Sequence, residues 1–258
     1  MKILLKIRYM GTNYCGYQVQ PNAVSVQQKL NEATAAVFGF DCDIVGCSRT
    51  DSGVHANEFC ATVAKKGTEA LETNIPIERI PLALSAHLPD DIAVFDARWV
   101  PEQFHARYDV REKEYLYRIY NSPIRDPFEV GRSCRVPKRI GDEALRKMQE
   151  AAQKFCGTHD FSAYMAQGSK VTSTTRTVTR ASVERNGDLI LFRVAADGFL
   201  YHMVRILAGT LVEVAEGKIS VDQIDAITAS CDRARAGMTM PACGLYLNRV
   251  VYWENIKN

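Results

Sequence analysis

The order of apolar repeats along the chain constrains its fold more than any other sequence feature. A strand is expected where apolar and β-branched residues cluster or alternate, and a helix where they recur every three or four residues. By this criterion the first half is predicted to form strands over residues 2–9, 42–46, 54–63 and 92–99 and helices over residues 26–37 and 74–84. Their order along the chain is strand, helix, strand, strand, helix, strand. Ser25 and Gln28 mark the start of the first helix, because this spacing favours a capping box.

The second half repeats this order. Its strands and helices are predicted over residues 114–120, 142–155, 176–184, 189–195, 199–215, 221–229 and 244–252. The pair Asn186-Gly187, between the two middle strands, is a strong hairpin signal. Two successive β-α-β-β-α-β units predict a mixed α/β (α+β) fold of two ferredoxin-like halves with mainly antiparallel sheets. We predict an N-terminal domain of residues 1–105 and a C-terminal domain of residues 106–258.

Composition narrows the class of protein. The 258 residues carry a net charge of +2, and no apolar run approaches the ~20 residues that a membrane span needs. Lys6 and Arg8 interrupt the apolar start of the chain, so we interpret it as a strand and not as a signal peptide. The eight cysteines form no C-x-x-C pair, which favours reduced thiols in a cytoplasmic protein over a metal finger or a disulfide framework.

Charge is distributed unevenly along the chain. Residues 98–147 contain twelve basic and eight acidic residues, and residues 170–185 contain four basic residues and one acidic residue. Such local excess suits a cationic face that binds a polyanion. An unevenly decorated, solvated surface is the alternative interpretation, and charge alone does not separate the two.

One connection carries residues that a turn does not require. The stretch from Gly46 to Ala56 joins two predicted strands, and its glycines and serines are typical turn residues. Arg49 and Asp51 lie one residue apart within it, where a fixed loop can direct a cation and a carboxylate away from the scaffold. The alternative is an aspartate that closes an Asx-turn beside a solvated arginine.

A family resemblance bears on this choice. Residues 49–56, with the sequence RTDSGVHA, are similar to the R-T-D-x-G-V-H-A signature of the TruA-type tRNA pseudouridine synthases. Other stretches match the family in the same order, namely YMGT at residues 9–12, GYQ at 16–18, SVQ at 25–27, FHARY at 104–108, YLYRIYN at 115–121, HMVR at 202–205 and GLYL at 244–247. Small departures include Tyr17, where the family frequently has tryptophan, and Ser52, where alanine is frequent.

The resemblance implies a fold, an activity and a set of partners. It implies two α/β domains whose sheets adjoin, with a central active-site cleft. The activity would be isomerisation of uridine to pseudouridine at positions thirty-eight, thirty-nine and/or forty of the tRNA anticodon stem-loop, by a cytoplasmic homodimer. No electron or hydride leaves in this reaction, so no metal or organic cofactor is expected.

The resemblance also assigns roles to individual residues. Asp51 corresponds to the essential carboxylate, whose role as nucleophile or base stays open, and Arg205 to the arginine that pairs with it. Arg49 corresponds to the residue that takes the place of the flipped base. Tyr115 corresponds to the tyrosine that packs on that base and is a candidate for proton transfer, and Leu245 to the apolar wall of the pocket.

Further cations are candidates for holding tRNA phosphates, namely Arg107, Arg111, Lys113, Lys170 and Arg176. Taken singly, Arg205 could equally be a helix-surface arginine and Tyr115 a core aromatic of a strand. We assign Tyr117 and Tyr120 to the core and expect His55 to order the loop behind Asp51.

Two other classes of protein compete with this interpretation. A non-catalytic RNA-binding protein is one, because ferredoxin-like sheets often bind RNA. Such a protein would need neither Asp51 nor Arg205. A hydrolase or metal-dependent phosphatase is the other, but the acidic residues near Asp51 do not have a recognisable ligand spacing.

Overall fold

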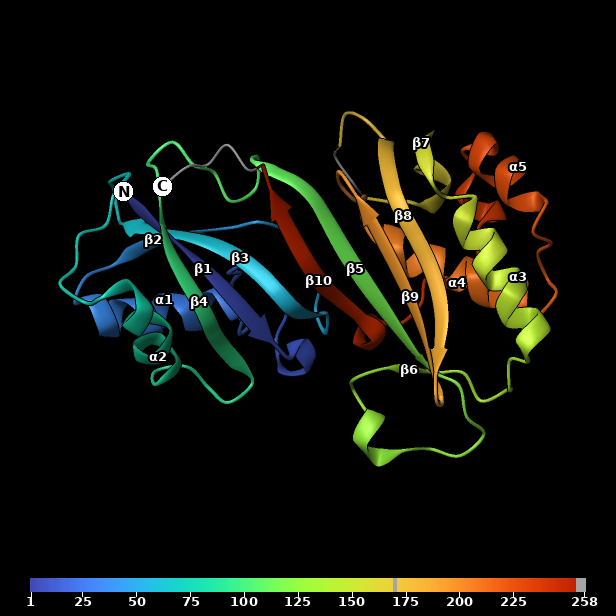
Figure 1. Cartoon of the computed structure of the whole chain (residues 1–258), viewed down its shortest axis with the longest axis horizontal. Coiled ribbons are helices and arrows are strands. Elements are labelled where there is room, and N and C mark those ends of the chain that lie inside the picture. Colours follow the sequence, from blue (N-terminus) through green and yellow to red (C-terminus); the bar gives the residue numbers. More distant parts are fainter. Residues whose placement is uncertain (169–170, 254–258) are drawn as a thin grey trace. The chain divides into compact units, whose positions relative to one another are not determined.

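The computed structural model describes residues 1–168 and 171–253 (Figure 1). The chain separates into two compact units. Unit 1 comprises Met1–Arg111 and the segment that begins at Tyr246, and unit 2 comprises Glu112–Leu245. The assignment of functions to domains of residues 1–105 and 106–258 stays a prediction.

Unit 1 has the predicted β-α-β-β-α-β order. Its elements are β1 (Lys2–Tyr9), α1 (Val26–Phe38), β2 (Cys42–Gly46), β3 (His55–Lys65), α2 (Ile80–Ser85) and β4 (Ile92–Val100). Strand β1 lies between β3 and β4 and is antiparallel to both, and β2 is antiparallel to the C-terminal part of β3. Strand β10 (Leu245–Tyr252) runs parallel to the start of β3, with Tyr246 opposite His55.

The first helix forms for the reasons that its sequence indicates. The Ser25 hydroxyl accepts a hydrogen bond from the Gln28 amide at 3.2 Å, which satisfies an amide that the helix itself cannot pair. Val26, Leu30 and Ala33 are buried on one face of α1, and the helix packs against α2 and β2. Gly39 ends it in the left-handed region, with a φ of 76°.

Unit 2 is built on an antiparallel sheet in the order β5-β9-β8-β7. Its elements are β5 (Val110–Tyr120), β6 (Cys134–Arg135), α3 (Asp142–Gln153), β7 (Gly157–Asp160), β8 (Thr175–Asn186), β9 (Leu189–Ala196), α4 (Met203–Ala215) and α5 (Gln223–Ser230). The short strand β6 lies parallel to β5. Helix α3 packs against α4 and β8. The β8–β9 hairpin turns at Gly187, as predicted, with a φ of 61°.

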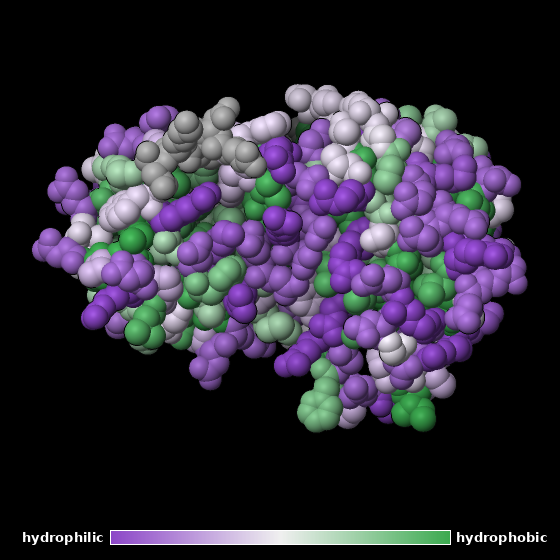
Figure 2. Space-filling model, in the orientation of Figure 1, coloured by the Kyte–Doolittle hydropathy of each residue, from purple (hydrophilic) through white to green (hydrophobic). Residues whose placement is uncertain are grey.

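The loop between β5 and β6 carries an apolar patch. Ile124, Phe128 and Val130 are each more than 70% exposed on it, and green side chains stand out on this loop in Figure 2. An ion pair ties this loop to β5, because the Arg118 guanidinium binds both carboxylate oxygens of Glu129 at 2.8 and 3.1 Å.

The mixed α/β class with mainly antiparallel sheets is confirmed. Three boundaries differ from the prediction by more than two residues. In unit 1, the helix predicted over residues 74–84 is confined to α2, because residues 77–79 form a 3-10 turn before it. In unit 2, β5 begins at Val110 and not at residue 114. Helix α4 begins at Met203 and not at Phe199, because His202 adopts a left-handed φ of 58° that no helix can include. The short strands β6 and β7 were not predicted. Within the part of the chain that the structure describes, no helix has the length and apolar character of a transmembrane span.

Candidate active site

Asp51 lies in the loop of residues 47–54, which joins β2 to β3, and its side chain is half-buried. Both ends of this loop are anchored. At the start, the Cys47 amide donates to the Cys60 carbonyl at 2.8 Å, and the Cys60 amide donates to the Cys47 sulfur at 3.4 Å. At the end, the Val54 amide donates to the Asp51 carbonyl at 3.1 Å and closes a turn. The catalytic candidate therefore lies on a fixed connection.

The segment after β1 braces this loop from a second direction. The Tyr17 amide donates to the Thr50 carbonyl at 3.1 Å. The Tyr9 hydroxyl and the Thr50 hydroxyl are hydrogen-bonded at 2.8 Å in a buried position. The Gly53 amide donates to the Tyr14 carbonyl at 3.3 Å. Asp51 is thus flanked on both sides by residues whose backbone is tied to residues 9–17.

Two glycines allow this close approach. A Cβ atom on Gly11 would lie 1.9 Å from the Val54 carbonyl oxygen, which is far inside contact distance. A Cβ atom on Gly16 would lie 2.5 Å from the Thr50 oxygen, and Gly16 also has a φ of +83°. Both positions therefore require glycine, because any side chain would clash with the Asp51 loop. The family-like stretches at residues 9–12 and 16–18 do not by themselves reveal this reason.

His55 supports the far end of the loop. It is fully buried at the first position of β3, and its Nδ1 atom accepts the Gly11 amide at 2.9 Å. Its ring stacks on Tyr246 with a centroid separation of 4.5 Å. This arrangement agrees with the expectation that His55 orders the loop behind Asp51.

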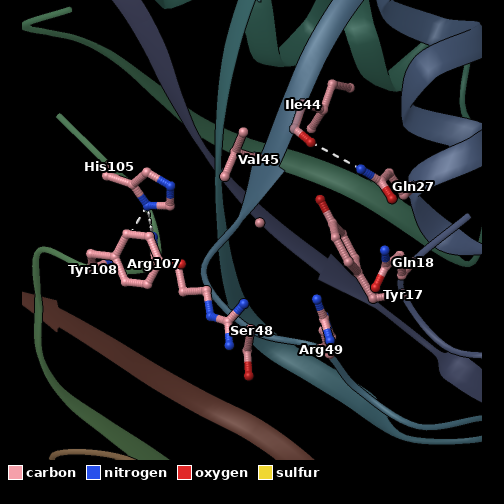
Figure 3. Close-up of a pocket in the computed structure, with 11 residues that line it drawn as sticks. Tyr17, Gln18, Gln27, Ile44, Val45, Ser48, Arg49, His105, Arg107 and Tyr108 are labelled. Atoms are coloured by element: carbon pink, nitrogen blue, oxygen red, sulfur yellow. Dashed lines mark hydrogen bonds between the residues drawn. The ribbon is translucent and has the colours of Figure 1, made fainter. Parts of the chain in front are cut away.

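A cavity of about 220 Å³ opens beside the Asp51 loop within unit 1 (Figure 3). It is lined by Tyr17, Gln18, Gln27, Ile44, Val45, Gly46, Ser48, Arg49, His105, Arg107 and Tyr108. The structure thus brings the predicted RNA-binding residues Arg49 and Arg107 to one cavity, although 58 positions separate them in the sequence. Tyr108 is the last residue of the family-like stretch at residues 104–108, but no role was predicted for it.

Tyr17 forms part of the inner wall of this cavity. Its ring stacks on Phe59 with a centroid separation of 4.1 Å. Its hydroxyl is buried and has no hydrogen-bond partner among the described residues. Burial, with a smaller contribution from the nearby Cys47 thiol, raises the pKa of Tyr17 above its usual range. Tyr17 therefore stays neutral and contributes packing to this wall.

Three predicted site residues belong to unit 2 or to its border. Tyr115 is buried in β5, and its ring meets Phe199 edge-on at 4.9 Å. Arg205 is half-buried in the first turn of α4, and its Nε atom donates to the Met240 carbonyl at 2.7 Å. Leu245 is buried at the first position of β10. The roles proposed for them in the reaction stay predictions.

The predicted phosphate-binding cations differ in their surroundings. Arg111 is exposed, and its guanidinium lies 5.9 Å from the centroid of the Trp253 ring. Arg176, at the start of β8, uses Nη1 to donate to the carbonyls of Ser173 and Thr175. Lys170 lies outside the described residues. Contacts of these cations with RNA stay predictions.

Of the two tyrosines assigned to the core, Tyr117 is fully buried, and its hydroxyl donates to the Pro241 carbonyl at 2.6 Å. Tyr120, at the end of β5, is half-buried.

A carboxylate on a braced loop beside a cavity with two arginines and an exposed tyrosine is the kind of site that an enzyme acting on nucleic acid needs. Comparison with known families agrees with this class. The family model described as tRNA pseudouridine synthase matches residues 6–109 and 151–253. The chain belongs to the tRNA pseudouridine synthase family.

Individual relatives extend the match to nearly the whole chain. The tRNA pseudouridine synthase A of Thermoanaerobacter sp. is 44% identical over 250 residues, which cover 97% of this chain and 99% of the relative. The protein of the same name from Ruminiclostridium cellulolyticum is 43% identical over 252 residues, with the same coverage. Among solved structures, a Cbf5-Nop10-Gar1 complex matches at a TM-score of 0.35 and 12% identity, over 95% of this chain and 58% of that one.

Proposed function

We propose that this chain isomerises uridine to pseudouridine at positions thirty-eight, thirty-nine and/or forty of the tRNA anticodon stem-loop, with Asp51 as the essential carboxylate. The observation that carries the proposal is the placement of Asp51 on a loop that is held at both ends and from the segment after β1. Family membership supports the reaction class.

The reaction explains why such a loop is needed. Uridine isomerisation breaks the glycosidic C–N bond and forms a C–C bond to the same base, so a carboxylate must be held against the sugar or the ring as nucleophile or base. A group that is fixed in position before the substrate arrives loses little entropy in reaching the transition state. Asp51 fits this requirement, and we propose that Arg205 and Tyr115 act in the same reaction.

Binding of the tRNA is proposed to involve base flipping. The target base must leave its stack before a carboxylate can reach it, which costs a few kcal/mol. We propose that Arg49 takes the space of the flipped base and that Leu245 lines the pocket that receives it. Arg107, Arg111, Lys170 and Arg176 are proposed to hold phosphates, and the exposed side chain of Arg107 at the cavity in unit 1 supports this role.

The assembly and location are part of the proposal. The patch of Ile124, Phe128 and Val130 supports a homodimer, because exposed apolar patches mark protein–protein contacts. The eight cysteines, all within the described residues, form no disulfide with one another, which supports a cytoplasmic enzyme. Light scattering that gives the mass of a single chain at micromolar concentration would contradict the dimer.

The central test replaces Asp51 by asparagine, which keeps the shape of the side chain and removes its charge. We expect turnover on an unmodified tRNA transcript to fall by at least about 10³-fold, because the reaction loses its reacting group. The Kd for the tRNA should stay within about threefold, because Asp51 makes no expected phosphate contact. Pseudouridine mapping and filter binding measure the two quantities.

Asp41→Asn is the matched control, because Asp41 is an exposed carboxylate ten positions earlier in the same domain. It should leave both quantities unchanged. Turnover by Asp51→Asn at the wild-type rate would remove the proposed role of Asp51. Tight tRNA binding by a wild-type chain that forms no pseudouridine would instead favour the non-catalytic RNA-binding alternative.

A further inference from the structure

The cavity of unit 1 presents an aromatic ring that the reaction described above does not use. Tyr108 is 73% exposed, although its ring lies 4.2 Å from that of His105. The Arg107 guanidinium lies 5.7 Å from the centroid of the Tyr108 ring. An exposed aromatic ring next to an arginine offers a stacking surface and a positive charge together.

The turn that carries this ring is rigid. His105 Nδ1 accepts the backbone amides of Arg107 and Tyr108 at 3.1 and 3.3 Å. The His105 amide donates to an Asp109 carboxylate oxygen at 2.8 Å, and the Asp109 amide donates to the His105 carbonyl at 3.1 Å. A ligand that stacks on Tyr108 would therefore not have to order the turn, which lowers the entropic cost of binding.

The rest of the cavity suits one nucleotide. Its wall is apolar at Ile44 and Val45, and the side chains of Gln18 and Ser48 supply polar groups. The Gln27 amide also lines it but is engaged by the Val19 amide and the Ile44 carbonyl. Figure 3 shows the side chains of Arg49 and Arg107 near Ser48, with His105 and Tyr108 beyond Arg107. Proteins bind unstacked RNA nucleotides with this combination of an aromatic platform, arginines at the phosphate and polar groups at the base edge.

The position of the cavity limits which nucleotide it can hold. Arg49 lines it and precedes Asp51 by two residues. Two residues of extended chain span at most about 7 Å, so the Cα atoms of Arg49 and Asp51 lie no farther apart than that. A nucleotide in the cavity would thus be a direct neighbour of the target in the RNA.

We infer that this cavity is a second nucleotide subsite. It holds the nucleotide next to the target uridine, with its base on Tyr108 and its phosphate at Arg107, while Arg49 stays available for the space of the flipped base. The inference rests on the proposed function and adds a binding residue, Tyr108, to it. The subsite keeps the strand open on one side of the flipped uridine, so it contributes to substrate binding and not to the chemical step.

The test uses anticodon stem-loop RNAs in which 2-aminopurine replaces the nucleotide before or after the target uridine. Stacking on an aromatic ring quenches the fluorescence of this base. With the wild-type chain we expect quenching at one of the two positions. Tyr108→Ala should abolish it and raise the Kd and KM for RNA by roughly tenfold to a hundredfold, with kcat within about twofold. Tyr108→Phe should retain the quenching and the affinity.

Phe95→Ala is the matched control. Phe95 is a partly exposed aromatic of unit 1, with the Arg8 guanidinium 4.2 Å from its ring centroid, but it does not line the cavity. This variant should bind and quench as the wild type does. Arg107→Gln should lower the slope of log Kd against log salt by about 1, as expected for one lost phosphate contact.

Two results would overturn the inference, and they are distinguishable. If Tyr108→Ala changes neither the fluorescence nor the Kd while the wild-type chain forms pseudouridine, the subsite is wrong and the proposed function stands. If the wild-type chain neither binds the RNA nor forms pseudouridine, the proposed function fails and the subsite fails with it.

Discussion

At the scale of single residues, Tyr9 and Tyr17 differ by one hydrogen bond. Both are buried tyrosines in contact with the ring of Phe59, but only the Tyr9 hydroxyl has a described partner, the Thr50 hydroxyl. A buried polar group without a partner costs about 1–3 kcal/mol. We therefore expect Tyr17→Phe to leave the free energy of unfolding unchanged or to raise it by about 1 kcal/mol, as measured by urea denaturation.

Tyr9→Phe provides the opposite case. It should lower the free energy of unfolding by about 1–2 kcal/mol, because it leaves the Thr50 hydroxyl in a buried position without this partner. The same variant should lower turnover, since Thr50 precedes Asp51. If both substitutions changed stability by the same amount in the same direction, the hydrogen bonding described for these two hydroxyls would be wrong.

The candidate site shows how far single residues can be predicted. Asp51, Arg49 and Arg107 were named from motif residues, and the structure places the two arginines in one cavity. The contribution of Tyr108 needed the fold, because the β2–β3 loop and the turn at residues 105–108 meet only in three dimensions. Arg176 was predicted as a phosphate contact, and its bonds to the carbonyls of Ser173 and Thr175 at the start of β8 could not be foreseen from charge.

At the scale of elements, residues 9–17 pack closely against the Asp51 loop. The importance of this close packing can be tested by substituting two glycines that have similar positive φ angles. Gly16 has a φ of +83° and Gly39 a φ of +76°, but a Cβ atom would meet the Thr50 oxygen at 2.5 Å only at Gly16. Both substitutions by alanine should cost about 1 kcal/mol for the left-handed backbone. Gly16→Ala should cost more and should also lower turnover at least about tenfold, because the carbonyl next to Asp51 must move.

Gly39→Ala is thus the control for the backbone term, and its turnover should equal that of the wild type. The comparison needs only urea denaturation and a pseudouridine assay on the two variants. Equal stability and equal turnover in both would show that the close approach at Gly16 does not hold the loop.

Elements with local signals were predictable from the sequence. The Ser25 cap, the Asn186-Gly187 turn and the apolar, β-branched and aromatic content of β1 are signals that act within a few residues, so they can be recognised in the sequence. The start of α4 was missed because the left-handed conformation of His202 is unusual for a non-glycine residue and has no local signal. Strands β6 and β7 are two and four residues long, and their pairing depends on partners far away in the sequence.

At the scale of the whole molecule, buried tyrosine hydroxyls and cysteine thiols should lower the free energy of unfolding as the pH becomes alkaline. Burial raises the pKa of Tyr164 to about 12 and that of Cys42 to about 11, from ordinary values of 10.0 and 9.0. Burial also raises the pKa values of Tyr117, Tyr252 and Cys60 above their usual ranges. These groups occur in both units, so the effect belongs to the chain as a whole.

The sign follows from the direction of the shifts. Below about pH 8 these groups are protonated in both states and contribute no pH dependence. Above that pH the unfolded chain releases protons that the folded chain still holds, so the free energy of unfolding falls as pH rises, by up to about 1.4 kcal/mol per pH unit for each group. We expect a flat profile from pH 7 to about pH 8 and a steep loss of stability from pH 9.5 to 11, measured by urea denaturation at each pH.

Tyr164→Phe isolates one of these groups. The variant loses the hydrogen bond between the Tyr164 and Thr228 hydroxyls at every pH, so the comparison must use the change with pH and not the absolute stability. Between pH 8 and 11 the variant should lose about 1.4 kcal/mol less than the wild type, which corresponds to one group with a pKa of 10.0 unfolded and about 12 folded. Parallel profiles for the two proteins over this range would show that Tyr164 ionises as readily in the folded chain as in the unfolded one.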